Sequence, residues 1–172
     1  MRLIKFAFIG LLVLFATATA LSLLLPSDMH ISRVINVRAS DRQAVYNAVT
    51  DLRVWEKWNE FVYGSSLTNV QLSSPSGGKG AWLRSDQLRI DEAKADSAGI
   101  LLNWDLSNGK QFAGGFQFLE LNEDSVTVQW WFDFHFRWYP WEKLGVFVYD
   151  RKLGPAMEES LAGLKRFVEN PR

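Results

Sequence analysis

The hydrophobic pattern begins with a long apolar run and later changes to shorter periods. Residues 6–25 contain no charge and follow Arg2 and Lys5. A helix of twenty residues rises about 30 Å, which matches the hydrocarbon thickness of a bilayer. The run therefore predicts a membrane-spanning helix, and the positive-inside rule places its N-terminus in the cytoplasm. We expect an anchor over residues 1–26 and one extracytoplasmic domain over 27–172, which would be periplasmic in a Gram-negative cell.

A cleaved signal peptide is the alternative interpretation of this run. Residues 16–18 and 18–20 both read Ala-Thr-Ala, which fits the small-x-small pattern at signal cleavage sites. Leu21 and Leu23–Leu25 extend the apolar run past both positions. This extension favours a retained anchor, although the sequence leaves both alternatives open.

Behind the run, the pattern predicts one strand and two helices. Residues 30–39 carry the apolar positions of a first strand. Ser40 and Gln43 have the spacing of a capping box, and the apolar residues that follow recur at helical intervals. We therefore expect a helix after Ser40 and a second short helix over residues 53–61.

From Gly64 onward, the apolar residues alternate with a period of two, which is typical of strands. The predicted strands are residues 68–73, 81–85, 87–94, 100–106, 111–121 and 125–138. Gly114 and Gly115 lie inside one of them and predict a bulge or sharp bend. In the last strand, the even-numbered residues from Val126 to Trp138 are all apolar and share one face. This face requires a large partner surface.

The C-terminal residues supply that partner. Residues 140–170 predict helix, with an interruption at Gly154-Pro155 and an apolar stripe after it. Together, the elements predict an α+β fold. A curved antiparallel sheet of about six or seven strands would wrap around the long C-terminal helix. Such an arrangement often leaves an apolar hollow between sheet and helix, here lined by Trp and Phe.

Composition and charge exclude several classes of function. The chain has 172 residues, of which 48% are hydrophobic and eight are Trp. Without Arg2 and Lys5, 17 basic residues stand against 19 acidic ones, which weighs against a basic nucleic-acid or polybasic lipid-binding surface. The absence of Cys removes thiol catalysis, disulfides and Cys-ligated zinc, and two His are too few for a His-rich metal site. We predict neither a metal nor a cofactor.

Three residues are candidates for catalysis. Asp133 and His135 lie two apart on the same face of the last predicted strand, where a His beside a carboxylate could act as a general base. The opposite face is apolar, so we favour the interpretation that this pair faces water. Arg84 could orient a carbonyl or carboxylate of a ligand, although cross-strand surface pairing is the interpretation that we favour.

Several segments, in this order, resemble the START-like helix-grip superfamily and, within it, the SRPBCC or polyketide cyclase/dehydrase group. They are SDRQAVYNAVT at 40–50, VWEKWNEF at 54–61, GFQFLELNEDSVTVQW at 115–130 and GPAMEESLAGLKRFVE at 154–169. Relatives often have a proline shortly after the second Trp of VWEKWNEF, where this chain has Asn59-Glu60. The resemblance implies a hydrophobic cavity for lipids, sterols, polyketides or quinones, with no shared cofactor and no shared active site.

The resemblance and the apolar run together predict a membrane-tethered module that binds a small hydrophobic ligand. The predicted ligand-binding residues are Trp58, Phe61, Trp82, Trp104, Phe116, Trp130, Phe132, Phe134, Leu144 and Val148. A cyclase/dehydrase-like enzyme is one alternative, and a protein-interaction module with a filled core is another. Trp138, Tyr139 and Trp141 could form a cavity lip, a membrane-interface contact or a plain loop cluster.

Overall fold

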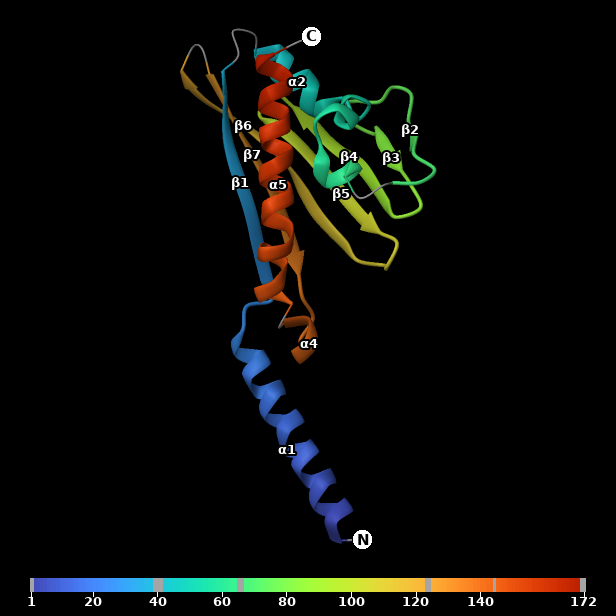
Figure 1. Ribbon diagram of the computed structural model, residues 1–172, viewed down its shortest axis with the longest axis vertical. Helices are drawn as coiled ribbons and strands as arrows, with labels where there is room; N and C mark the ends of the chain where they lie inside the picture. The colour runs from blue at the N-terminus through green and yellow to red at the C-terminus, as the bar shows by residue number, and fades with distance from the viewer. Residues whose placement is uncertain (1, 39–41, 65–66, 123–124, 144, 171–172) are drawn as a thin grey trace.

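The structure is a computed structural model that describes residues 2–38, 42–64, 67–122, 125–143 and 145–170, with only the backbone described at 120–122 and 146–148 (Figure 1). The helices are α1 (Arg2–Leu24), α2 (Arg42–Thr50), the 3-10 helix η1 (Val54–Lys57), α3 (Glu60–Tyr63), α4 (Pro140–Lys143) and α5 (Val146–Glu169). The strands are β1 (Asp28–Arg38), β2 (Gln71–Leu72), β3 (Trp82–Arg84), β4 (Leu88–Asp96), β5 (Gly99–Leu106), β6 (Gln111–Asn122) and β7 (Ser125–His135).

The seven strands form one antiparallel sheet in the order β1-β7-β6-β5-β4-β3-β2. The sheet is curved, and α5 lies along its inner face over β1 and β7, while α2, η1 and α3 cover the inner face farther along the sheet (Figure 1). This confirms the predicted α+β helix-grip architecture. The even-numbered residues of β7 face α5 because strand side chains alternate between the two faces.

Most of helix α1 lies outside this core. Almost all of its side chains are exposed, and its most apolar 18-residue window has a mean hydropathy of 2.3. Among the described residues, it is the one helix that is long and apolar enough to cross a membrane. In Figure 1, α1 leads away from the end of the domain at which β1 and α5 begin.

The sequence predicts a bulge or a sharp bend at Gly114 and Gly115, and the bulge is not formed. Both residues pair in continuous register with β5 and with β7. A Cβ on Gly114 would lie 2.4 Å from Cδ1 of Phe132, and one on Gly115 would lie 2.1 Å from the carbonyl oxygen of Ile100. The two glycines therefore allow close approach between neighbouring strands and side chains.

The second predicted helix is divided into η1 and α3. Asn59 has φ −89° and ψ 84°, which interrupts the helical backbone. Its side-chain oxygen accepts a hydrogen bond from the backbone N–H of Val62 at 3.1 Å, so it caps the first turn of α3. The predicted helix start at Ser40 lies outside the described residues.

The predicted interruption at Gly154-Pro155 is also wrong, because α5 runs through Pro155. The guanidinium of Arg33 on β1 binds Asp150 at 2.9 Å and Glu158 at 2.7 Å, on the helical turns either side of the proline. A Cβ on Gly154 would lie 2.3 Å from Nη2 of Arg33. Proline has no backbone N–H to donate within a helix. The two ion pairs hold α5 against β1 on both sides of this position, and Gly154 leaves room for the guanidinium.

The last strand is shorter than predicted. β7 ends at His135, and Trp138 is 53% exposed instead of facing the core. The six preceding apolar residues of the pattern, Val126 to Phe136, are buried. The chain leaves the sheet after His135 and enters α4 at Pro140, which is favourable in a first helical turn.

Candidate functional site

The candidate site is the aromatic interior between the sheet and the helices. Strands β5, β6 and β7 contribute inward-facing rings, and η1 and α3 contribute rings from the opposite side. Its members are Trp55, Trp58, Phe61, Trp104, Phe116, Trp130 and Phe132. These residues include six of the predicted ligand-binding residues, and Trp55 joins them.

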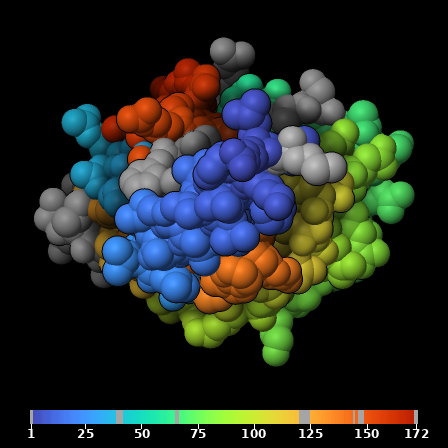
Figure 2. All heavy atoms as spheres, turned by 90° about the horizontal axis from the view of Figure 1, so that it is seen from below, coloured from blue at the N-terminus to red at the C-terminus, as the bar shows by residue number. Residues whose placement is uncertain are grey.

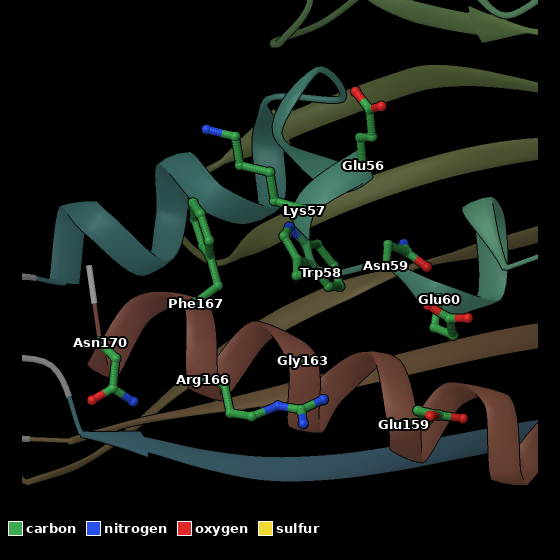
Figure 3. Close-up of a pocket in the computed structure, with 10 residues that line it drawn as sticks. All are labelled: Glu56, Lys57, Trp58, Asn59, Glu60, Glu159, Gly163, Arg166, Phe167 and Asn170. Carbon is green, nitrogen blue, oxygen red and sulfur yellow. The ribbon is translucent and has the colours of Figure 1, made fainter. Parts of the chain in front are cut away.

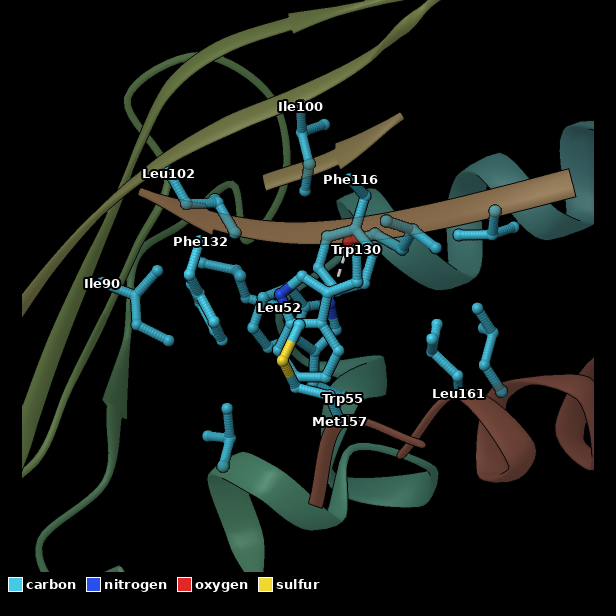
Figure 4. Packing of buried hydrophobic residues seen from close by; sticks show 14 of the residues in the cluster. Leu52, Trp55, Ile90, Ile100, Leu102, Phe116, Trp130, Phe132, Met157 and Leu161 are labelled. Carbon is cyan, nitrogen blue, oxygen red and sulfur yellow. Dashed lines mark hydrogen bonds between the residues drawn. The ribbon is translucent and has the colours of Figure 1, made fainter. Parts of the chain in front are cut away.

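The rings of the interior pack directly on one another (Figure 4). Trp104 and Phe132 meet edge to face with centroids 5.2 Å apart, and Phe116 stacks on Trp130 at 4.9 Å. Such offset and edge-to-face arrangements are the favoured geometries of aromatic pairs. Trp55, Trp104, Trp130 and Phe132 are at most 1% exposed. This part of the interior is therefore filled by its own side chains.

The four indole N–H groups of the interior differ in their hydrogen bonding. Nε1 of Trp55 donates to the carbonyl of Val49 at 2.8 Å, and Nε1 of Trp58 donates to that of Ala48 at 3.0 Å. Nε1 of Trp104 and Nε1 of Trp130 have no acceptor among the described residues. A buried donor without a partner costs about 1–3 kcal/mol. The inner wall thus holds two donors that an acceptor on a bound molecule could satisfy.

The interior continues toward the N-terminal end of α5. Phe134 contacts Phe112 at 4.7 Å and Tyr149 of α5 at 5.0 Å between ring centroids. Phe112 and Tyr149 are only half-buried, and Nζ of Lys110 contacts the hydroxyl of Tyr149. This end of the interior is less closed than the centre.

Two further predicted ligand-binding residues are not fully described by the structure. Leu144 lies outside the described residues. Val148 lies on α5, where only its backbone is described.

A buried carboxyl group faces inward at another place on the sheet. Glu92 on β4 is 2% exposed, on the same face as Leu88 and Ile90. Its Oε2 accepts from the backbone N–H of Gly78 at 3.1 Å, and its Oε1 has no partner among the described residues. Burial raises the pKa of Glu92 to about 7, against the opposing effect of the Gly78 N–H. Such a group can take up or release a proton near neutral pH.

Sequence analysis missed Glu92. The signal was available, because Glu92 continues the alternation of Leu88 and Ile90 and so falls on the apolar face. Glu side chains are seldom fully buried. An inward-facing position for one therefore indicates an unusual environment around its carboxyl group.

The structure places Asp133 and His135 on the outer face of β7. Each pairs with β1 and not with the other: Nδ1 of His30 lies 2.6 Å from Oδ1 of Asp133, and Nδ1 of His135 lies 2.7 Å from Oδ1 of Asp28. All four side chains are more than half exposed. They therefore lie on the opposite side of the sheet from the aromatic interior.

Arg84 and Trp82 also lie outside the interior. On β3, Leu83 faces the core, so its neighbours Trp82 and Arg84 point to the other face. The guanidinium carbon of Arg84 lies 4.3 Å from the centroid of the Trp82 ring, a cation–π contact. Trp82 is the one described member of the predicted ligand-binding set that lies apart from the interior.

Hollows on the surface include a polar groove and a shallower depression on the outer face. A groove of about 700 Å³ runs between η1–α3 and the C-terminal part of α5 (Figure 3). Its lining is mostly polar and includes Lys57, Glu60 and Arg166. A shallower hollow of about 440 Å³ on the outer face contains His30 and Trp131. Among the described residues, no cluster of three or more His, Asp or Glu side chains is placed to hold a metal ion.

The fold is similar to several solved structures. It matches DynU16, a protein of the dynemicin biosynthetic locus, at 18% identity and a TM-score of 0.58, over 83% of this chain and 48% of DynU16. It matches protein SA2116 from Staphylococcus aureus at 13% identity and a TM-score of 0.59, over 83% and 95% of the two chains. This chain thus spans about half the length of DynU16.

A third similar structure has bound small molecules. Norcoclaurine synthase from Thalictrum flavum, in complex with dopamine and hydroxybenzaldehyde, matches at 10% identity and a TM-score of 0.60, over 84% of this chain and 88% of the enzyme. At these identities, the likeness establishes the fold alone. No curated protein sequence matches the chain. Residues 28–169 match the family described as polyketide cyclase/dehydrase and lipid transport, and the chain belongs to this family.

Proposed function

We propose that the chain is a binding module for a small hydrophobic ligand, held at the outer face of the cytoplasmic membrane by α1. The observation that carries the proposal is the pair of buried indole donors in an otherwise apolar aromatic wall. An apolar molecule with one oxygen acceptor would bury its carbon skeleton against the rings. Its oxygen would satisfy Nε1 of Trp104 or Nε1 of Trp130.

Entry would occur at the end of the interior near the start of α5. Phe112 and Tyr149 are half-buried there, whereas the rings at the centre are closed to solvent. Since the centre is filled, binding would require the N-terminal half of α5 to move away from β6 and β7. The complex of norcoclaurine synthase with dopamine and hydroxybenzaldehyde supports the idea that this fold can admit aromatic molecules.

The tether would suit a ligand that partitions into lipid. Only residues 25–27 separate α1 from β1. Three residues span at most about 11 Å, so the domain would remain next to the bilayer. In this proposal, Phe61, Phe116, Phe132 and Phe134 contact the ligand, and Leu144 and Val148 remain predicted contacts.

The test uses the full chain, extracted in detergent and reconstituted into nanodiscs of one synthetic phospholipid. Mass spectrometry of an organic extract should find a retained molecule of a few hundred daltons that differs from that phospholipid. Trp130→Phe removes an inner-face indole donor and should lower its occupancy. Trp131→Phe changes the next residue on the outer face and should leave the occupancy unchanged.

Two results would count against the proposal. One is an extract with no retained molecule that stays empty after incubation with total lipid extract. The other is equal occupancy in Trp130→Phe and Trp131→Phe, since the indole donors would then play no part. Near-UV circular dichroism of both variants checks that each retains its packed aromatic core.

The close packing of the rings favours a second candidate, a protein-interaction module with a filled core. Trp55, Trp104 and Trp130 have almost no accessible surface, so the interior could serve stability alone. This candidate predicts an empty extract, and the same experiment therefore separates it from the binding module.

An enzyme of the cyclase/dehydrase kind would need an acid or base on the inner face. Among the described residues, Glu92 meets this requirement because it faces inward and its pKa is raised to about 7. If the retained molecule is a product of catalysis, Glu92→Gln should lead to retention of its precursor. An identical retained molecule in Glu92→Gln would contradict a catalytic role of this carboxyl group.

A further inference from the structure

The end of α1 is built into the folded domain. Ser22, in the last turn of α1, is 3% exposed, and its hydroxyl donates to the carbonyl of Trp138 at 2.7 Å. Just after α1, the carbonyl of Ser27 accepts a hydrogen bond from the backbone N–H of Phe136 at 2.8 Å. The connection between α1 and β1 is therefore fixed on the segment that joins β7 to α4.

Lys143 is buried within this connection, which we call the joint. The side chain is 3% exposed, although it belongs to a residue type that is almost never fully buried. Its ammonium group donates to the carbonyl of Leu25 at 2.6 Å and to the hydroxyl of Ser27 at 2.9 Å. The last carbonyls of a helix lack intrahelical partners and carry partial negative charge. Lys143 thus satisfies the C-terminal end of α1 and in turn has its own charge stabilised.

The same joint carries the two most exposed Trp side chains among the described residues. Trp138 is 53% exposed and Trp141 is 63% exposed. Tyr139 lies between them, with ring centroids 4.8 Å from Trp138 and 5.1 Å from Trp141. Figure 2, which looks at the domain from the α1 end, shows orange atoms of the α4 region beside the blue helix α1. An apolar helix therefore ends beside a surface cluster of Trp and Tyr.

We propose that Trp138, Tyr139 and Trp141 lie in the headgroup layer of the membrane and that Lys143 locks the domain in one orientation on the bilayer. This inference rests on the proposed anchoring by α1. Trp and Tyr favour the membrane–water interface, where their rings contact both apolar and polar groups. The bilayer is the partner that fits, because the cluster lies where α1 would leave the hydrocarbon core.

The orientation has a consequence for the aromatic interior. β1 and α5 both begin near the joint, and β7 ends there (Figure 1). Phe136 and Phe134 follow each other away from the joint and contact Tyr149 of α5 at 5.4 and 5.0 Å. The less closed end of the interior would thus face the membrane, and a ligand could pass between bilayer and protein without crossing bulk water.

Since the chain has no cysteine, single fluorescent labels can test this arrangement in the full chain. The labelled variants are Trp141→Cys in the cluster, Arg166→Cys near the far end of α5, and Leu12→Cys within α1. Arg166 lies about 30 Å along α5 from its first residue. Each variant is reconstituted into phosphatidylcholine nanodiscs that carry a nitroxide quencher either at the headgroup or in the acyl chain.

We expect headgroup nitroxide to quench the label at position 141 several-fold more strongly than the label at position 166. Acyl-chain nitroxide should quench the label at position 12. Equal quenching at 141 and 166, with position 12 quenched, overturns the interfacial position of the cluster and leaves the anchor intact. An unquenched label at position 12 overturns the anchor itself, and the interfacial proposal with it.

The lock is tested by Lys143→Met in the Trp141→Cys background, with Lys152→Met on the exposed surface of α5 as the matched control. Loss of the ammonium group should free the joint and reduce quenching at position 141, whereas Lys152→Met should leave it unchanged. Ser22→Ala removes the second contact and should cause a smaller reduction. Unchanged quenching in both Lys143→Met and Ser22→Ala overturns the lock.

Discussion

The two faces of the sheet are made by alternate residues of the same strands, but polar groups on the two faces differ in exposure and in hydrogen bonding. On the outer face of β7, Asp133 pairs with His30, and both remain more than half exposed. On the inner face, Nε1 of Trp130, Nε1 of Trp104 and Oε1 of Glu92 are buried without partners among the described residues. Water can solvate any unpaired group on the outer face, but it does not reach these inner atoms.

The unpaired polar atoms of the inner face reduce the stability of the folded chain. Most buried polar groups in folded proteins are hydrogen-bonded, and exceptions often occur at functional sites. The exposed His–Asp pairs resemble a catalytic arrangement in the sequence. Because they are exposed to water, they contribute little to stability. The unpaired inner atoms are more informative about function, although no sequence motif marks them.

The largest expected effect comes from truncating neighbours on opposite faces. Trp130→Ala removes a fully buried ring and should lower the free energy of unfolding by about 3–5 kcal/mol. Trp131→Ala removes a partly buried ring whose partner is His30, at 6.1 Å between centroids, and should cost about 1 kcal/mol. Thermal and denaturant unfolding in detergent micelles, followed by circular dichroism, measures both values. Equal losses would remove the energetic distinction between the two faces.

Glu92 should make stability depend on pH. Its pKa is raised from 4.5 to about 7 in the folded state, so the folded chain binds more protons than the unfolded chain between these values. The associated stability is fully present below about pH 4.5 and is lost as the pH rises through 7. Over the full interval, the loss should be on the order of 3 kcal/mol.

Thermal unfolding of the full chain in micelles at pH 5.0 and pH 8.0 measures this effect, with Glu92→Gln as the comparison. The amide cannot ionise, so the variant should lose less stability across this interval than the unmodified chain. Asp133→Asn, on the outer face, should keep the full pH dependence of the inner carboxyl group. An unchanged pH dependence in Glu92→Gln would show that another group causes it.

The smallest effect is expected on the outer face. Asp133→Asn and Asp28→Asn each remove one exposed His–Asp pair and should change the free energy of unfolding by about 0–1 kcal/mol. Melting temperatures at low and high salt measure the change, which should shrink further as salt screens the charges. A loss that rivals Trp130→Ala would mean that these pairs are structural supports and not solvated surface groups.

The aromatic interior and the long apolar helix α1 could be predicted from the sequence because both depend on local patterns. Alternation assigns Trp130 and Phe132 to one face of a strand and Asp133 to the other without knowledge of any partner. The same rule places Glu92 inward, although its raised pKa also requires knowledge of the burial around it. The length of the apolar run in α1 is likewise a property of consecutive residues.

Only the tertiary structure determined which side chains of distant segments contact one another. The register between β1 and β7, about a hundred residues apart in sequence, gives Asp133 and His135 separate partners. Arg33 on β1 allows α5 to continue through Pro155, and Lys143 joins α4 to the end of α1. Periodicity specifies the face on which a side chain lies, because it follows from the local backbone. Contacts between distant segments depend on how whole elements pack, and local patterns carry no record of that.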